Sequence, residues 1–226
     1  MNDRLTIYSG PLSMFGAKVQ IAALEKGLHF DLIMVPYDSK RGYDPKHPEV
    51  LRINPKRQVP VLTHGDVEIF DSTQIFEYLE DFAPTPALWP RDPVARARAR
   101  NLEHLSDEVY FPHVIKLMGL QDALTTEPAI VAIEAANRFY ADMEKRLDSD
   151  WLAGSFSFAD IAFYMAALFG ERQGAPLTTS TPRLLAWRER MGRRAPVRTV
   201  VSAMATWLET AGRPVPVFMQ AARRAS

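Results

Sequence analysis

The sequence contains no cysteine, which excludes several kinds of chemistry. Without thiols the chain cannot form disulfides, hold zinc through thiolates, carry a CxxC redox motif or use a cysteine nucleophile. Long apolar runs are lacking too: the longest, residues 161–169, has nine residues, against the ~20 that span a bilayer. The opening MNDRLTIYSG also lacks the pattern of a signal peptide. We therefore expect a cytoplasmic protein.

An excess of either charge is absent as well, because 27 Lys and Arg balance 27 Asp and Glu. A chain without net charge is not drawn to nucleic acid or to an anionic membrane. The densest basic stretches, residues 95–100 and 188–194, have no interleaved aromatic residues, so we interpret them as solvated helix faces. We expect neither a nucleic-acid nor a membrane partner.

Proline marks the division of the chain. Four of the 17 prolines fall within residues 83–93, a stretch that cannot continue a helix. We place a linker there, between an α/β domain at 1–82 and an all-helical domain at 94–226. In the second domain, Ser157 and Asp160 have the spacing of a capping box and predict the start of a buried helix.

Strand and helix patterns alternate before the linker. Alternation of apolar and polar residues predicts strands, whereas apolar residues at helical spacing predict helices. The predicted order is a strand at 4–8, a helix at 14–26, a strand at 30–35, an unassigned segment at 36–53, a hairpin at 59–63 and 67–70, and a helix at 71–82.

The hairpin raises a question, because it begins with Val59-Pro60. Proline cannot donate to a sheet ladder and is confined to edges, strand starts and bulges. The backbone beside Pro60 therefore lies either on a sheet edge or is left for a partner that is not this protein.

Four segments in this order and spacing resemble the cytosolic glutathione S-transferases: residues 7–28, 54–62, 71–80 and 151–163. Within that family the chain is similar to the bacterial, serine-type, theta- and zeta-like members. The resemblance implies a thioredoxin-like domain followed by an all-α domain, a homodimer, glutathione as co-substrate and no metal. No HExxH or GxSxG motif points to another chemistry.

The resemblance also implies a binding mode. The Val59-Pro60 peptide would be cis, and the free backbone of Val59 would pair with the cysteinyl unit of glutathione as an added strand does. Ser72 and helix N–H groups would hold the γ-glutamyl carboxylate, and Asp71 would meet its ammonium. Gln58 would reach the glycine end. From the residues alone, Asp71 could simply cap a helix. His47 and Lys40 are weaker candidates for the glycyl carboxylate.

Ser13 stands where the first helix begins. One interpretation is a helix N-cap; the other, implied by serine-type relatives, is a hydroxyl that donates to the glutathione sulfur. Tyr8 is the rival donor, since other classes use a tyrosine near the first strand. Phe15 occupies the position of the cysteine of cysteine-type classes, so that chemistry is excluded.

The sequence gives weaker evidence for the binding site of the second substrate. Tyr110, Phe111 and Met118 fall where the family's first long helix of domain two faces the cleft, so they are candidates for an apolar pocket. Aromatic residues at helical spacing are more often core residues, and that alternative stays open.

These inferences favour a glutathione transferase that activates the thiolate for attack on a small hydrophobic electrophile. Glutathione-dependent peroxidase, isomerase and dehalogenase reactions begin from the same thiolate and also remain open. The alternative is a non-catalytic protein of this fold that binds ligands or another protein.

Overall fold

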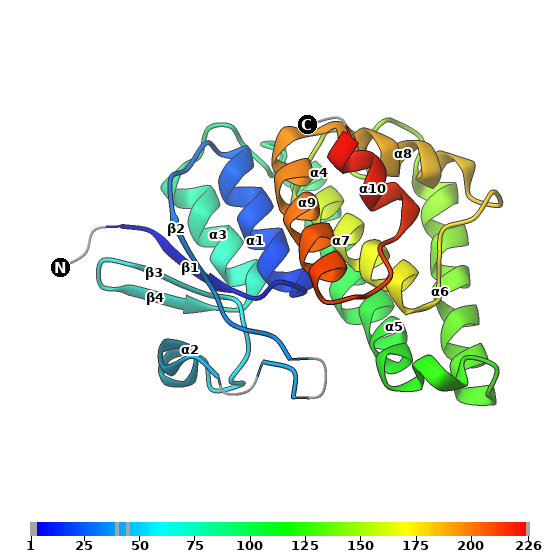
Figure 1. Cartoon of the computed structure of the whole chain (residues 1–226). Coiled ribbons are helices and arrows are strands. Elements are labelled where there is room, and N and C mark those ends of the chain that lie inside the picture. Colours follow the sequence, from blue (N-terminus) through cyan, green and yellow to red (C-terminus); the bar gives the residue numbers. More distant parts are fainter. Residues whose placement is uncertain (1–3, 39–40, 44–45, 225–226) are drawn as a thin grey trace. The chain divides into compact units, whose positions relative to one another are not determined.

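The computed structural model describes residues 4–38, 41–43 and 46–224. The chain forms two compact units (Figure 1). Unit 1 comprises residues 1–87 and 196–214, and unit 2 comprises 88–195 and 215–226. Most of α9 (Ala195–Thr210) thus belongs with the first unit, although the sequence analysis placed it in the helical domain. Its Trp207 ring lies 5.5 Å from the ring of Tyr37. This tertiary contact cannot be predicted from a local sequence pattern.

Unit 1 is built on a four-stranded mixed sheet of order β2-β1-β3-β4. The central pair β1 and β3 is antiparallel, as are β3 and β4, whereas β1 and β2 run parallel and are joined by a helix. The strand bounds are β1 Thr6–Ser9, β2 Asp31–Met34, β3 Val61–His64 and β4 Val67–Phe70.

Helices cover both faces of this sheet (Figure 1). On one face, α1 (Met14–Glu25) and α3 (Ser72–Phe82) pack their apolar residues against alternate positions of β1 and β3. On the other face lies α2 (Pro48–Ile53), within the segment that the sequence left unassigned. The sequence-predicted thioredoxin-like arrangement is confirmed. The first core consists of Leu5, Ile7, Val19, Ala23, Leu62, Ile75 and Leu79, and the second of Tyr8, Val35, Val50 and Val61.

A buried cation joins α1 to α3. The Lys26 Nζ lies 2.5 Å from the Glu80 carboxylate and donates to the carbonyl oxygens of Ala83 and Pro86 at 2.7 and 3.0 Å. Since an ammonium has three N–H donors, these partners satisfy it completely. The chain after α3 is thereby held to the end of α1.

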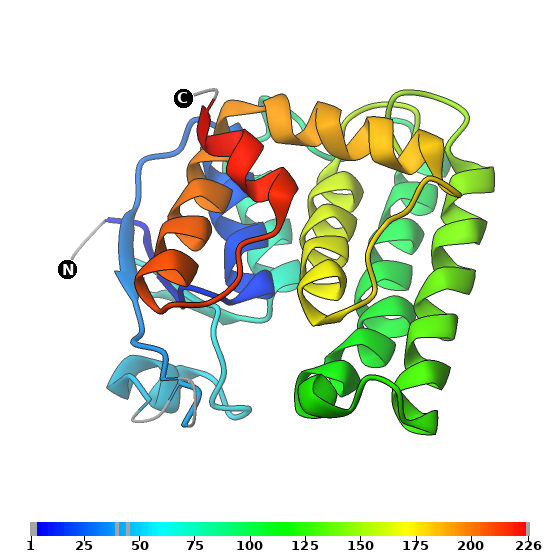
Figure 2. The same cartoon turned by 45° about the vertical axis from the view of Figure 1, so that its right-hand side comes forward.

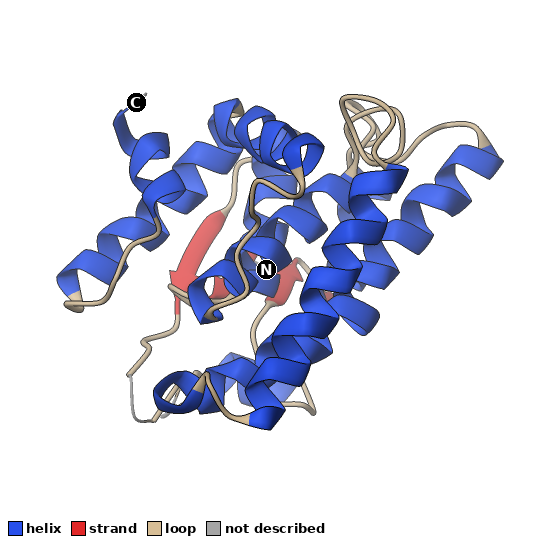
Figure 3. Cartoon of the chain, turned by 90° about the vertical axis from the view of Figure 1, so that its right-hand side faces the viewer, coloured by secondary structure: helices blue, strands red, loops and turns tan. Residues whose placement is uncertain are grey.

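All regular elements that the structure describes in unit 2 are helices, joined by loops (Figure 3). A long run formed by α4, η1 and α5 lies beside α6 (Figure 2), and the buried α7 packs against this run and α8. The Ser157–Asp160 capping box predicted from the sequence is present at the start of α7. No described helix is long and apolar enough to cross a membrane. The bounds are α4 Pro93–His104, η1 (π-helix) Leu105–Tyr110, α5 Phe111–Leu117, η2 (3₁₀) Met118–Ala123, α6 Glu127–Arg146, α7 Phe158–Gln173, α8 Pro182–Arg193 and α10 Val217–Arg224.

Candidate functional site

Strand register brings three of the predicted segments to one end of the sheet in unit 1. Tyr8, near the end of β1, pairs with Val61 at the start of β3, and Val61 pairs with Phe70 at the end of β4. The turn after β1, the residues before β3 and the residue after β4 therefore all leave the sheet at the same end. These are the positions of Ser13, Val59-Pro60 and Asp71-Ser72.

Ser13 closes the turn between β1 and α1. Its N–H donates to the Gly10 carbonyl oxygen at 3.0 Å, and its Oγ accepts from the Gly16 N–H at 3.0 Å. Ser13 is therefore the N-cap of α1. Because a hydroxyl accepts and donates at once, capping leaves the proton for another partner, and no acceptor for it occurs among the described residues. The two interpretations of Ser13 are compatible.

Tyr8 lies on the α2 side of the sheet. Its ring belongs to the apolar cluster with Val35, Val50 and Val61, and its centroid lies 4.9 Å from that of the His47 ring. Burial, with a smaller contribution from the Glu49 carboxylate, raises the pKa of the Tyr8 hydroxyl above its ordinary value. The ring thus serves the core of that face.

The loop before β3 is shaped by Asn54, a residue that the sequence analysis did not single out. Asn54 is 3% exposed. Its Nδ2 donates to the Gln58 carbonyl oxygen at 2.6 Å, and its Oδ1 accepts from the Lys56 N–H at 2.9 Å. Its own carbonyl accepts from the Arg57 N–H, and Arg57 has a left-handed φ of 55°. Arg57 thus adopts a conformation that glycine would enter without strain.

The Val59-Pro60 peptide is cis, as the resemblance implied. Pro60 precedes an interior strand rather than lying on an edge, and the ladder begins only at Val61. No backbone partner of the Val59 N–H or carbonyl is found in residues 4–38, 41–43 and 46–224. Of the two explanations for the proline, the structure favours a backbone that the described residues leave unpaired.

Asp71 and Ser72 begin α3. The Asp71 Oδ1 accepts from the N–H groups of Thr73 and Gln74 at 3.0 and 3.4 Å. Two of the N–H groups that we expected for an incoming carboxylate are thus already used. Ser72, which is 3% exposed, contributes its hydroxyl, for which the described chain offers no partner, and the first N–H of the helix.

The candidates for the glycine end of glutathione are dispersed. Gln58 is exposed, and its carbonyl is held by Asn54. His47 is the N-cap of α2, with Nδ1 accepting from the Glu49 N–H at 3.2 Å, so it has a structural role. Lys40 lies outside the described residues.

Comparison with known proteins decides the family. The family model "Glutathione S-transferase, N-terminal domain" matches residues 12–81, and "Glutathione S-transferase, C-terminal domain" matches 126–195. Glutathione S-transferase Z2 of Arabidopsis thaliana is 32% identical over 169 residues, covering 74% of this chain and 73% of the relative. The chain belongs to the glutathione S-transferase family.

Further comparisons show how much of the chain resembles known proteins in structure and in sequence. A glutathione S-transferase from the Antarctic clam Laternula elliptica superposes with a TM-score of 0.75 at 27% identity, covering 87% of this chain and 91% of that structure. A stringent starvation protein A homolog of Coxiella burnetii is 34% identical, and the match covers 50% of this chain and 51% of the relative. The chain thus spans about half the length of several curated relatives that it matches. The glutathione S-transferase fold is confirmed, and the family's co-substrate is glutathione.

Tyr110 corrects the predicted second-substrate pocket. Its side chain is fully buried in unit 2, where its hydroxyl bonds to that of Tyr140, which in turn donates to the Ala175 carbonyl at 2.9 Å. Gly170 leaves room for the Tyr110 hydroxyl, because a Cβ there would lie 2.0 Å from it. A residue that closes a core cannot line an open pocket. The alternative left open by the sequence, that it is a core aromatic, holds.

Phe111 and Met118 remain candidates for that pocket. The half-buried Phe111 ring lies 5.1 Å from that of Phe169, and Met118 is 53% exposed at the start of η2. Both residues belong to unit 2, whereas the candidate glutathione site is in unit 1. That they line a second-substrate pocket therefore stays a prediction.

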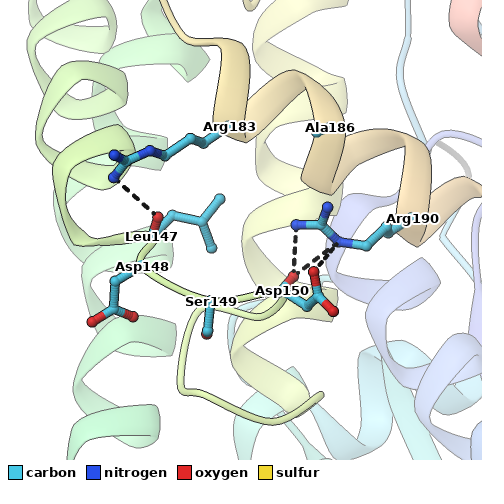
Figure 4. A pocket seen from close by; sticks show the side chains of 7 residues that line it. All are labelled: Leu147, Asp148, Ser149, Asp150, Arg183, Ala186 and Arg190. Carbon is cyan, nitrogen blue, oxygen red and sulfur yellow. Dashed lines mark hydrogen bonds and ion pairs between the residues drawn. The ribbon is translucent and has the colours of Figure 1, made fainter.

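A hollow of about 430 Å³ lies elsewhere on unit 2, between α8 and the loop after α6 (Figure 4). Arg183 donates to the Leu147 carbonyl at 3.4 Å, and the Arg190 guanidinium donates to the Asp150 carbonyl at 3.1 and 2.9 Å. Both arginines therefore fasten the loop to α8.

The described residues do not include a group of three or more His, Cys, Asp or Glu that could hold a metal ion.

Proposed function

We propose that this chain is a serine-type glutathione transferase that binds glutathione at the β1–β3–β4 end of the sheet in unit 1. The register Tyr8–Val61–Phe70 carries the proposal, because it gathers the three segments described above at one end. In their arrangement they present a hydroxyl donor, a backbone segment at Val59 with no backbone partner among the described residues, and a helix N-terminus. Glutathione offers a thiol, a peptide backbone and an anionic γ-glutamyl group as their counterparts.

The tripeptide would bind mainly through its ends and its backbone. The Val59 N–H and carbonyl would pair with the cysteinyl unit, and main-chain pairing of this kind provides affinity with little dependence on side chains. The Ser72 hydroxyl and N–H would take the γ-glutamyl carboxylate at the start of α3. The outer oxygen of Asp71 would take the ammonium, and Gln58 would reach the glycine end.

Ser13 would hold the sulfur as a thiolate. A helix N-terminus favours an anion by ~0.3–1 kcal/mol, and a hydrogen bond to a charged acceptor contributes ~1.5–3 kcal/mol. Lowering a thiol pKa from ~8.5 by two units requires about 2.7 kcal/mol, so the two effects together suffice. The thiol proton passes to solvent, and the thiolate lone pair then forms a bond to a carbon of a small hydrophobic electrophile. The electron pair of the bond that breaks leaves with the displaced group as an anion or, in an addition to an activated double bond, takes up a proton from solvent. Peroxidase, isomerase and dehalogenase reactions are other outcomes of the same thiolate.

The test compares the absorbance of the bound thiolate against pH for the wild-type protein and Ser13→Ala. Ser13→Ala should raise the pKa of the bound thiol by about one unit or more, and activity near pH 7 should fall about tenfold or more. Activity should partly recover at higher pH, because glutathione then ionises unaided. Loss of the cap should also lower stability by about 0.5–2 kcal/mol.

Asp92→Ala is the matched control. Asp92 caps α4 by accepting from the Ala95 N–H at 2.8 Å, so its removal should lower stability by a similar amount and leave the titration in place. Superimposable titrations for wild type and Ser13→Ala would remove Ser13 from the mechanism and transfer the role to Tyr8 or to backbone N–H groups.

A non-catalytic binding protein is the second candidate. The similarity to a stringent starvation protein A homolog, whose name states no transferase activity, favours keeping it. Tight binding of glutathione without turnover of chemically diverse electrophiles would select it.

A further inference from the structure

The turn that carries Ser13 is held from outside by Tyr43, a residue in the segment that the sequence left unassigned. The ring of Tyr43 lies directly against Gly10, where a Cβ would come within 2.1 Å of its Cε1 atom. Its hydroxyl accepts from the Leu12 N–H at 3.3 Å. Gly10 and Leu12 lie three residues and one residue before Ser13, so one side chain touches the turn at two points.

The Tyr43 hydroxyl provides a hydrogen-bond acceptor for a backbone N–H of this turn. Residues 10–13 form a β-turn closed by the Ser13 N–H donating to the Gly10 carbonyl, with Pro11 in the second position. The N–H at the third position of such a turn points away from the closing hydrogen bond. Tyr43 supplies the acceptor for it, and the absence of a side chain at Gly10 lets the ring approach.

The ring of Tyr43 is itself supported. Tyr37 meets it edge to face at 4.9 Å, and Trp207 of α9 meets Tyr37 edge to face at 5.5 Å. Aromatic pairs of this geometry contribute stabilising free energy in addition to that from the area that they bury. All three rings belong to unit 1, so they form a continuous path from α9 to the Ser13 turn.

We propose that Tyr43 is a positioning residue for Ser13, and that Tyr37 and Trp207 brace it. This role rests on the proposed function, since it concerns the geometry of a hydroxyl that donates to the sulfur. A hydrogen bond weakens steeply as its donor–hydrogen–acceptor angle departs from linear. A turn free to rock would therefore change the donor's angle to the sulfur while leaving the tripeptide's other contacts in place.

Tyr43→Phe is the decisive variant, because it keeps the ring and removes only the hydroxyl. We expect the pKa of bound glutathione to rise by about half a unit, which is about a threefold loss of thiolate well below that pKa. Glutathione affinity measured at pH 5, where the thiol is protonated in both proteins, should be unchanged. Amide hydrogen exchange at Leu12 should accelerate with or without glutathione.

Tyr78→Phe is the control for loss of a tyrosine hydroxyl. The Tyr78 hydroxyl bonds to His64 Nδ1 at 2.7 Å, at the opposite end of β3 from the Ser13 turn. This variant should change neither the titration nor exchange at Leu12. Trp207→Leu, which removes the outermost ring, should raise the thiol pKa in the same direction by less than Tyr43→Phe does.

The outcomes separate this role from the proposed function. A wild-type titration at the pKa of free glutathione would overturn the proposed function, and the role of Tyr43 with it. A lowered wild-type pKa with an unmoved Tyr43→Phe curve would overturn the role of Tyr43 alone, as would unchanged exchange at Leu12. An unmoved Trp207→Leu curve would overturn the brace.

Discussion

Asp71 combines a cap with an unusual backbone conformation. It has a φ of 75°, a region that costs a non-glycine residue about 1–3 kcal/mol unless its surroundings fix it. Asparagine and aspartate tolerate positive φ better than other residues. The hydrogen bonds from Thr73 and Gln74 to Oδ1 retain the conformation of this exposed residue. Capping uses Oδ1, so the proposed contact with the γ-glutamyl ammonium would use the other carboxylate oxygen.

Asp71→Asn separates these two uses. The amide oxygen can still cap α3 and the residue still tolerates positive φ, so stability should change little. The negative charge that would meet the γ-glutamyl ammonium is lost, and the dissociation constant for glutathione should rise about tenfold, equivalent to ~1.4 kcal/mol. Calorimetric titration measures the change.

Asp71→Ala is the companion variant, since it removes the cap as well and should also lower stability by ~1 kcal/mol. Equal glutathione affinity for wild type and Asp71→Asn would show that the charge takes no part in binding.

Arg57 shows how a residue choice can mislead about local geometry. Arginine rarely adopts a left-handed conformation, yet Arg57 has a φ of 55°. The hydrogen bonds that Asn54 makes with residues 56–58 impose it. Side-chain hydrogen bonds within a short loop can outweigh a backbone preference of this size.

At the scale of helices and strands, the pairing of Lys26 with Glu80 links α1 to α3. The Lys26 side chain is fully buried and that of Glu80 is 11% exposed. Lys26→Met would leave a buried carboxylate without its cation, and we expect a loss of about 3–5 kcal/mol in the free energy of unfolding. Chemical denaturation followed by circular dichroism measures it.

The double variant Lys26→Met with Glu80→Leu is the control for this pair. Because no charge is then left unpaired, it should recover most of the loss. A single Lys26→Met variant as stable as the wild type would show that the ion pair does not hold the two helices together.

The whole molecule is expected to be a homodimer, as the family resemblance implies. Sedimentation at micromolar concentration should give a species of twice the 25.5 kDa chain mass. A dilution series should then show a concentration-dependent return toward the monomer. A single 25.5 kDa species at every concentration would contradict the prediction.

The sequence by itself determined the features that depend on neighbouring residues. Period-2 and helical patterns predicted the four strands of unit 1 with α1 and α3, but they left α2 unassigned and placed α9 in the helical domain. Cap chemistry marked the start of α7 at Ser157. Asp71-Ser72 was recognisable as a helix start because a cap has its own residue requirements, and Pro60 as a strand start because proline cannot donate to a sheet ladder. Ser13 could be placed at the start of α1 because serine also caps helices. The cis peptide at Val59-Pro60 was implied only by the family resemblance.

Only the tertiary structure decided how these segments meet. Strand register, set by side-chain packing between β1, β3 and β4, brings Ser13, Val59 and Asp71 to one end of the sheet. Tyr110 became a core residue because Gly170 and Tyr140, far along the chain, enclose its hydroxyl. The contact of Tyr43 with Gly10 likewise joins residues from separate segments. Such contacts depend on the packing of the folded chain, which neither local propensity nor periodicity encodes.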